Sequence, residues 1–100
     1  MSDAVLFVSI GTPNPDAPEA LQKYATEAPP LLMAGGAKPK VKAKLVERLV
    51  GANSAGTLFV AEFPSAQAVH DVFSSDAYQA LVPVRDRAFV ELNFMIMETF

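Results

Sequence analysis

The chain has 100 residues, of which 51% are apolar, with five glycines, eight prolines, no cysteine and a formal net charge of −3. This length suits a single domain over residues 1–100, and the apolar content excludes a disordered chain. The lack of cysteine excludes disulfides, thiolate metal sites and cysteine nucleophiles, and the negative charge gives no general attraction to nucleic acid.

The first predicted element is a strand over Val5–Ile10. This run is apolar, is rich in β-branched residues and is followed by Gly11, Thr12 and Pro13, which predict that the strand ends there. Because the run is apolar at consecutive positions, both of its faces are expected to be buried. We therefore expect a central strand of the sheet.

A helix is predicted next, beginning after Asp16. Asp16 is a suitable N-cap, and Glu19, three residues later, would complete a capping box. The adjacent prolines Pro29 and Pro30 predict a kink or a restart, and Gly35 and Gly36 predict the end. An apolar stripe follows helical spacing at Leu21, Tyr24, Ala25, Ala28 and Leu32.

The segment Lys38–Val50 supports two interpretations. Val41, Leu45 and Leu49 recur every four residues, as in a helix, and this local pattern is slightly favoured. Lysines also alternate with apolar residues at period two, as in a strand. The order of the other elements favours the strand. The turn-rich segment Gly51–Gly56 is predicted to be a loop.

The second half of the chain contains a strand, a broken helical region and a final strand. Thr57–Phe63 is a predicted strand, and Ser65 is the expected N-cap of a helix that contains Phe73. A short helical turn from Ser75 is expected to stop near Pro83. The alternating run Ala88–Glu98 is the last predicted strand.

With Lys38–Val50 as a strand, the elements follow a βαββαβ order. This order predicts an α+β, ferredoxin-like fold with a four-stranded antiparallel sheet and two helices on one face. No further segment is left to cover the other face of the sheet. We therefore expect a homodimer in which a second copy packs sheet against sheet.

From Thr57 onward the chain resembles domain-of-unknown-function family thirteen-thirty. The resemblance extends upstream through Pro18–Ala20, Tyr24, Pro30 and Gly35–Gly36. It covers nearly the whole chain and is most specific between Phe59 and Ala88. The residues that carry it there are Phe59, Glu62, Phe63, Pro64, Ser65, Ala68, Phe73, Ser75, Tyr78, Leu81, Pro83, Arg85 and Ala88.

This resemblance implies a dimeric α/β barrel in which Lys38–Val50 is the second strand. The family has no assigned reaction, so it supplies no catalytic residues. Relatives in the wider superfamily include cofactor-free oxygenases, haem-degrading enzymes, isomerases and ligand-binding proteins, and fold alone does not choose among them. We expect either a cofactor-independent enzyme for a small organic acid or aromatic compound, or a non-catalytic module that binds a small ligand or a protein.

Glu62 and His70 are two candidate ligand-binding residues, each with a structural alternative. Glu62 interrupts an apolar strand, where burial would raise its pKa toward a role in proton transfer. Alternatively, strand alternation directs it to a salt bridge with Arg85 or a lysine, within the chain or at the dimer interface. His70, the single histidine, could act as a base or an axial ligand, although a surface histidine is the more common case.

Tyr24, Tyr78 and Arg85 complete the candidate ligand-binding set. The tyrosines could donate hydrogen bonds inside a pocket, and Arg85 could hold a carboxylate. Alternatively, the tyrosines pack at the edge of the core, and Arg85 belongs to a solvated turn with Asp86 and Arg87.

Several partner classes are not expected. One histidine without a matching motif predicts no metal and no cofactor. The lysine run Lys38–Lys44 could bind an anion, but it lacks interleaved aromatics, so protection of an edge strand is favoured over nucleic-acid binding. No stretch approaches the roughly 20 apolar residues of a membrane span, and residues 4–10 lack the charged start of a signal peptide. We expect a cytoplasmic protein.

Overall fold

One antiparallel sheet organises the chain in the computed structural model, which describes residues 3–52 and 55–100. Within these residues the strands are β1 (Val5–Pro13), β2 (Lys38–Lys44), β3 (Thr57–Phe63) and β4 (Phe89–Met97). Their order across the sheet is β2-β3-β1-β4. The prediction that the first strand is central is therefore confirmed.

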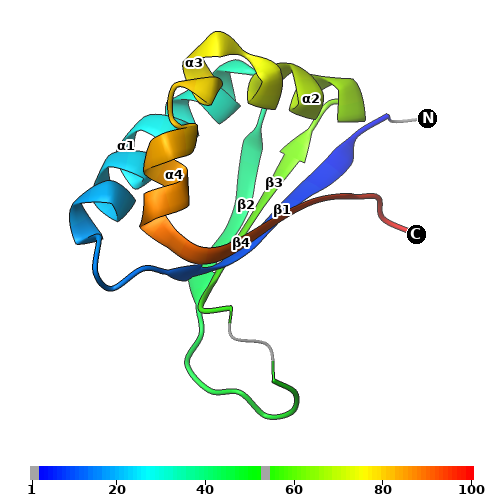
Figure 1. Ribbon diagram of the computed structural model, residues 1–100. Helices are drawn as coiled ribbons and strands as arrows, with labels where there is room; N and C mark the ends of the chain where they lie inside the picture. The colour runs from blue at the N-terminus through cyan, green and yellow to red at the C-terminus, as the bar shows by residue number, and fades with distance from the viewer. Residues whose placement is uncertain (1–2, 53–54) are drawn as a thin grey trace.

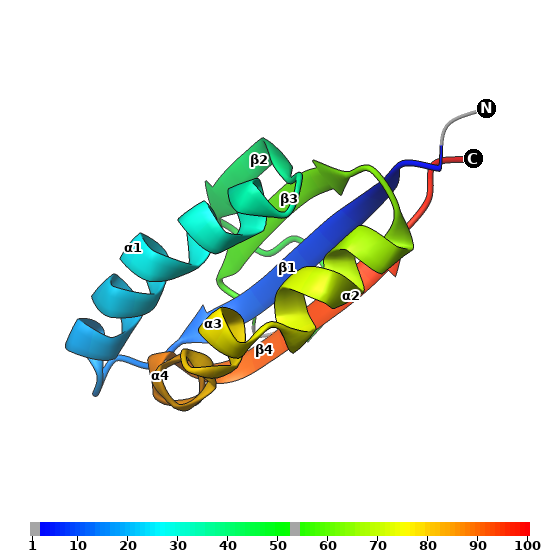
Figure 2. The ribbon, with the colours of Figure 1, turned by 90° about the horizontal axis from the view of Figure 1, so that it is seen from above.

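The helices assigned in the described residues all lie over the same face of this sheet (Figures 1 and 2). Seen from above, α1 lies toward the β2 side, and the other helices lie toward the β4 side (Figure 2). This arrangement is the predicted ferredoxin-like fold, with the second helical region divided into three pieces. The helices are α1 (Pro18–Ala34), α2 (Ala66–Ser74), α3 (Asp76–Gln79) and α4 (Val82–Ala88).

The hydrophobic core fills the space between the sheet and the helices. Phe7, Phe63 and Tyr78 are the largest fully buried side chains, and full burial of such a side chain stabilises the fold by about 1.5–3 kcal/mol. Gly35 lets the end of α1 approach α2 closely, because a Cβ at this position would overlap Val72 Cγ2. Other buried members of the core are Ala28, Leu32, Ala37, Ala61, Val69, Val72 and Leu81.

The predicted end of the first strand at Ile10 was wrong. β1 continues to Pro13, because Gly11 and Thr12 pair with Leu92 and Glu91 on β4. The pairing register shifts only between Thr12 and Pro13. The long partner strand thus extends β1 through residues that the local sequence predicts to end the strand.

The predicted cap of α1 was also wrong, although the position of the helix was nearly right. Its N-cap is Ala17, without a side-chain cap, while Asn14 Oδ1 accepts a hydrogen bond from the Asp16 backbone at 3.0 Å. The helix also continues through Pro29 and Pro30 without a restart. The carbonyls that lose their helical donors belong to residues 25 and 26, which are exposed, so water can satisfy them.

The end of α1 agrees with the prediction. Gly35 is the C-cap, and Gly36 follows with φ of 103°, a conformation that favours glycine.

Lys38–Lys44 forms strand β2, so the slight local preference for a helix was wrong. Pairing with β3 satisfies the backbone groups along one edge of the strand and overrides the four-residue apolar spacing. The strand is shorter than the resemblance implied, because residues 45–52 form a loop. Residues 53 and 54 of the predicted Gly51–Gly56 loop lie outside the described residues.

The elements after β3 follow the prediction with one exception. Ser65 caps α2, since its Oγ accepts a hydrogen bond from the Ala68 backbone at 3.1 Å, and the short turn after Ser75 is α3. The helical region does not end near Pro83, however, because α4 continues it from Val82 to Ala88. Pro83 lies in the first turn of α4, where its missing N–H has no helical partner to lose. Arg85 therefore lies on a helix and not in a solvated turn.

No helix in residues 3–52 and 55–100 has the length and apolar character needed to cross a bilayer.

Candidate functional site

A cavity of about 510 Å³ lies between α1 and the sheet. Its walls come from β1, β2, β3, β4, α1 and α2, and they are mainly aromatic and aliphatic. A cavity of this size and character is typical of small-molecule sites. The apolar wall includes Phe7, Leu32, Phe59, Phe73, Phe89 and Phe94.

Small side chains on two facing elements create this space. Ala25 and Ala28 lie on α1, and Ser9 lies on β1, and all three line the cavity. Larger side chains at these positions would fill it. The aromatic rings around the cavity hold one another in fixed orientations: Phe7 and Phe94 have centroids 5.0 Å apart, as do Phe7 and Phe73.

Two lysines add positive charge to this largely apolar wall. Lys42 and Lys44 lie on the edge strand β2, where they pair with Phe59 and Thr57 of β3. Both line the cavity and both are exposed, so they mark its open side. An anionic group at the mouth of the cavity would meet two ammonium groups.

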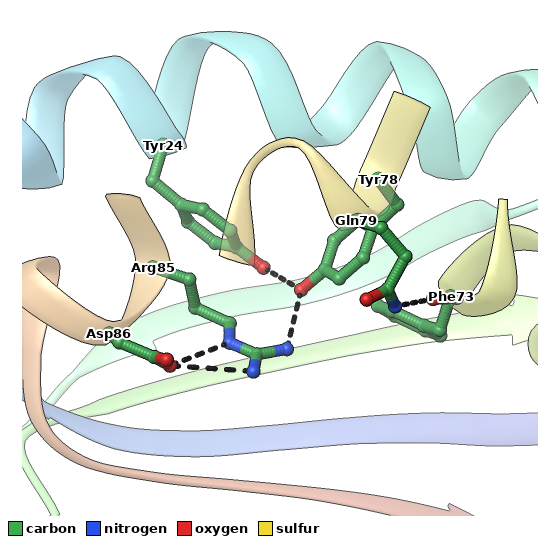
Figure 3. Close-up of polar contacts among 6 residues, drawn as sticks. All are labelled: Tyr24, Phe73, Tyr78, Gln79, Arg85 and Asp86. Carbon is green, nitrogen blue, oxygen red and sulfur yellow. Dashed lines mark hydrogen bonds and ion pairs between the residues drawn. The ribbon is translucent and has the colours of Figure 1, made fainter. Parts of the chain in front are cut away.

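Tyr24, Tyr78 and Arg85 form a polar cluster beside the cavity (Figure 3). The hydroxyls of Tyr24 and Tyr78 are 2.6 Å apart, and Arg85 Nη1 donates to the Tyr78 hydroxyl at 3.4 Å. Asp86 contacts the same guanidinium, with its Oδ1 3.4 Å from Arg85 Nε. Tyr24 lines the cavity, whereas Tyr78 is fully buried behind it.

The electrostatics of this cluster keep Tyr24 neutral and Arg85 charged. Burial raises the pKa of Tyr24 well above its ordinary value of 10.0. Burial disfavours the charge on Arg85, but the hydrogen bond to Tyr78 and the nearby Asp86 carboxylate outweigh it and raise the pKa of Arg85. The cavity is therefore lined by a protonated phenol, with a charged guanidinium in the cluster behind it.

The structure brings together three of the five predicted site residues. Tyr24, Tyr78 and Arg85 form the cluster, but Glu62 and His70 do not join it. Glu62 lies on β3 between Ala61 and Phe63, which are both fully buried under the helices, so strand alternation directs Glu62 to the opposite face. His70 is exposed on α2, away from the cavity lining.

Within the single chain, Glu62 does not form the predicted salt bridge. Arg85 lies on the helix side of the sheet, and Glu62 faces away from it. Lys38 is the cross-strand neighbour of Glu62, yet no ion pair joins them in the described part of the chain.

Lys42 and Lys44 were not among the predicted site residues. Their period-two spacing in the sequence was a usable signal, because it places both lysines on one face of a strand. The sequence does not reveal that this face adjoins a cavity. Within residues 3–52 and 55–100, no group of three or more histidine, aspartate or glutamate residues could hold a metal ion.

Comparison with known proteins gives a family and a fold. The family model described as Domain of unknown function (DUF1330), the family thirteen-thirty that the sequence resembles, matches residues 9–100. No curated protein matches the chain.

Solved structures with the same fold come from several bacteria. A protein of unknown function from Rhodopseudomonas palustris is 18% identical, with a TM-score of 0.82, covering 100% of this chain and 85% of that chain. A dimeric ferredoxin-like protein of unknown function from Jannaschia sp. is 9% identical, with a TM-score of 0.75 and coverage of 96% and 99%. SnoaB, a cofactor-independent oxygenase from Streptomyces nogalater, is 13% identical, with a TM-score of 0.69 and coverage of 98% and 94%. These likenesses confirm the predicted ferredoxin-like fold.

Proposed function

The chain belongs to the DUF1330 family, and we propose that it is a homodimeric protein that binds a small aromatic or largely apolar organic acid without a cofactor. The observation that carries this proposal is the cavity between α1 and the sheet, with apolar walls and two lysines at its open side. The apolar part of the ligand would enter the cavity, and its carboxylate would remain near Lys42 and Lys44.

The balance of apolar and polar groups supports a ligand of this kind. Aromatic rings bury much apolar area and make specific ring contacts, so a planar aromatic ligand would fit the Phe59, Phe73 and Phe94 side of the cavity. A charged carboxylate deep inside would lose its hydration without full compensation. At the exposed lysines it would keep contact with water.

Binding is better supported than catalysis. The described residues that line the cavity include no histidine and no carboxylate, so no general base of ordinary type faces a bound ligand. The raised pKa of Tyr24 keeps its phenol protonated at neutral pH. A cofactor-independent enzyme is the second proposal, favoured by the grouping of Tyr24 with Arg85, and turnover of a bound acid would support it.

A titration of the protein with naphthoate tests the binding proposal. We expect saturable heat release in calorimetry and a rise in the melting temperature. The uncharged methylnaphthalene should bind more weakly. Replacement of both lysines, Lys42→Met with Lys44→Met, should weaken naphthoate binding roughly tenfold, because exposed ion pairs contribute about 0.2–1 kcal/mol each.

Lys23→Met is the matched control, because Lys23 is exposed on α1 and does not line the cavity. It should leave the affinity unchanged. No binding of naphthoate at millimolar concentration, or equal affinity for methylnaphthalene in all variants, would contradict the proposal.

The homodimer proposal is supported by the face of the sheet that the helices leave open. The strand register aligns Val41, Val60, Val8 and Met95 in one row across all four strands. Strand alternation directs this row away from the helices, and its members are partly or fully exposed in the single chain. An apolar surface of this kind is typical of a protein interface.

The loop after β2 adds three exposed apolar side chains. Val46, Leu49 and Val50 are 93%, 87% and 92% exposed. The loop projects from the sheet on the side away from the helices (Figure 1). A second copy docked on the open face would therefore lie within reach of this loop, which we propose to be a dimerisation arm.

Sedimentation equilibrium tests the dimer. The wild type should sediment as a dimer at micromolar concentration, and Val8→Glu should shift it toward monomer, since Val8 lies in the apolar row. Thr26→Glu, on the exposed face of α1, is the matched control and should remain dimeric. A monomeric wild type would overturn this part of the proposal. The cytoplasmic location and the absence of nucleic-acid partners stay predictions.

A further inference from the structure

The hydrogen bond between the two tyrosines has a direction that Arg85 determines. The oxygens of Tyr24 and Tyr78 are 2.6 Å apart, and either hydroxyl could be the donor from distance alone. Each hydroxyl has one proton to donate and two lone pairs to accept with. A guanidinium has only donors, so the contact from Arg85 Nη1 uses a lone pair of Tyr78.

Only one direction satisfies the buried Tyr78 hydroxyl. If Tyr24 donated to Tyr78, the Tyr78 oxygen would accept from both neighbours and its own proton would have no acceptor in the described structure. Tyr78 is fully buried, so water could not supply one. The direction that satisfies all groups is donation from Arg85 to Tyr78 and from Tyr78 to Tyr24.

This direction leaves the proton of Tyr24 without a partner inside the cluster. Tyr24 lines the cavity, so its remaining donor is available to a bound molecule. We propose that Tyr24 donates a hydrogen bond to a carbonyl oxygen of the ligand, and that the ligand class is therefore an aromatic acid that also carries a carbonyl group. This inference rests on the proposed function, because it concerns the same cavity.

The surrounding rings hold the donor in place before a ligand arrives. The Tyr24 ring meets the Phe89 ring edge to face at 5.9 Å, and the Tyr78 ring meets the Phe73 ring in the same way at 4.6 Å. Arg85 also lies over the Tyr78 ring, at 5.8 Å from its centroid. Because these contacts fix both phenols, little freedom is lost on binding, and Arg85 and Tyr78 act as positioning residues for Tyr24.

Two ligands of equal charge and similar shape test this donor. An acetylnaphthoate has a carbonyl oxygen, and the isopropylnaphthoate of the same substitution pattern has a methyl group in its place. The wild type should bind the acetyl compound about fivefold to tenfold more tightly, as expected for one hydrogen bond. The preference should fall to about one in Tyr24→Phe and to an intermediate value in Arg85→Met. Lys23→Met should retain it.

The preference, rather than the affinity alone, is informative, because a variant that merely loosened the fold would weaken both ligands equally. An unchanged preference in Tyr24→Phe would overturn the inference and leave the proposed function intact. If neither acid bound to the wild type, the proposed function would fail. A second measurement, made without ligand, then decides the direction of the hydrogen bond.

Hydroxyl exchange provides this ligand-free measurement, since the chain has only two tyrosines. In protein labelled at tyrosine Cζ, solvent deuterium shifts the carbon resonance and reports how fast each hydroxyl proton exchanges. The Tyr78 proton, held between the two phenolic oxygens, should exchange more slowly than that of Tyr24, and Arg85→Met should reduce the difference. Tyr24→Phe and Tyr78→Phe assign the resonances. Slower exchange at Tyr24, or equal rates, would overturn the inference.

Discussion

Removal of the Tyr78 hydroxyl in Tyr78→Phe should lower the free energy of unfolding by about 1–3 kcal/mol. The ring remains, so its contact with Phe73 at 4.6 Å and the buried apolar volume are kept. What is lost is a hydroxyl that joins two neighbours, at 2.6 Å to Tyr24 and 3.4 Å to Arg85. For a domain of this size each 1 kcal/mol corresponds to roughly 4–8 °C in melting temperature.

A double-mutant cycle isolates the bond between the two phenols. Tyr24→Phe leaves the Tyr78 proton buried without an acceptor, so it should also destabilise, and the double variant should lose less than the sum of the single losses by roughly 0.5–3 kcal/mol. Urea unfolding followed by circular dichroism, at one fixed protein concentration, gives each free energy.

Thr26→Val is the matched control for deleting a hydroxyl. Thr26 Oγ1 donates to the Gln22 carbonyl at an exposed site, so its removal should change the stability by no more than about 0.5 kcal/mol. Additive losses in the cycle would refute the coupling. A neutral Tyr78→Phe would refute the argument that its hydroxyl is satisfied in the folded protein.

Three other results are expected. Gly35→Ala should destabilise the fold by roughly 1–3 kcal/mol in urea unfolding, because the added Cβ would overlap Val72. Gly56→Ala should be nearly neutral, because the nearest neighbour of its Cβ would be 3.7 Å away. Equal losses of stability in the two variants would contradict the steric argument. The pKa of Tyr24 in the folded protein is raised above its ordinary value of 10.0. The free energy of unfolding that Tyr24 contributes is therefore complete below pH 10 and falls by about 1.4 kcal/mol per pH unit above it. A plot of the free energy of unfolding against pH should be flatter in this range for Tyr24→Phe. Leu49→Ser should weaken dimer association several-fold in sedimentation and leave the unfolding of the monomer unchanged, because Leu49 is exposed in the single chain. Unaltered association would show that the loop after β2 is not part of the dimer interface.

Patterns with strong local signals were predictable from the sequence. Thr57–Phe63 is a short, mostly apolar run and is a strand. Ser65 caps the helix after it, because the side chain alone can satisfy a free backbone donor. The segments that local pattern alone misassigns depend on distant partners. Lys38–Lys44 becomes a strand only through its pairing with β3, and Gly11 joins β1 only because β4 lies beside it.

The site was predictable as a set of residue types but not as a constellation. Tyr24 and Tyr78 are 54 residues apart, so nothing in local spacing reveals that their hydroxyls meet. Glu62 is different, because the buried neighbours Ala61 and Phe63 place it on the opposite face by strand alternation alone. When Lys38–Val50 is interpreted as a strand, the same alternation places Lys42 and Lys44 on one face.

The small residues along the cavity are the strongest argument that the space serves a ligand. A void beside a core forfeits dispersion contacts, and in a domain of 100 residues, where total stability is modest, such a loss is a sizeable fraction. A purely structural domain would gain by placing a larger side chain at Ala28 or Ser9. A ligand restores the missing contacts, and at a concentration of one hundred times Kd it would add about 2.7 kcal/mol to the stability of the folded state. The open space is thus easiest to account for as a place where another molecule completes the packing.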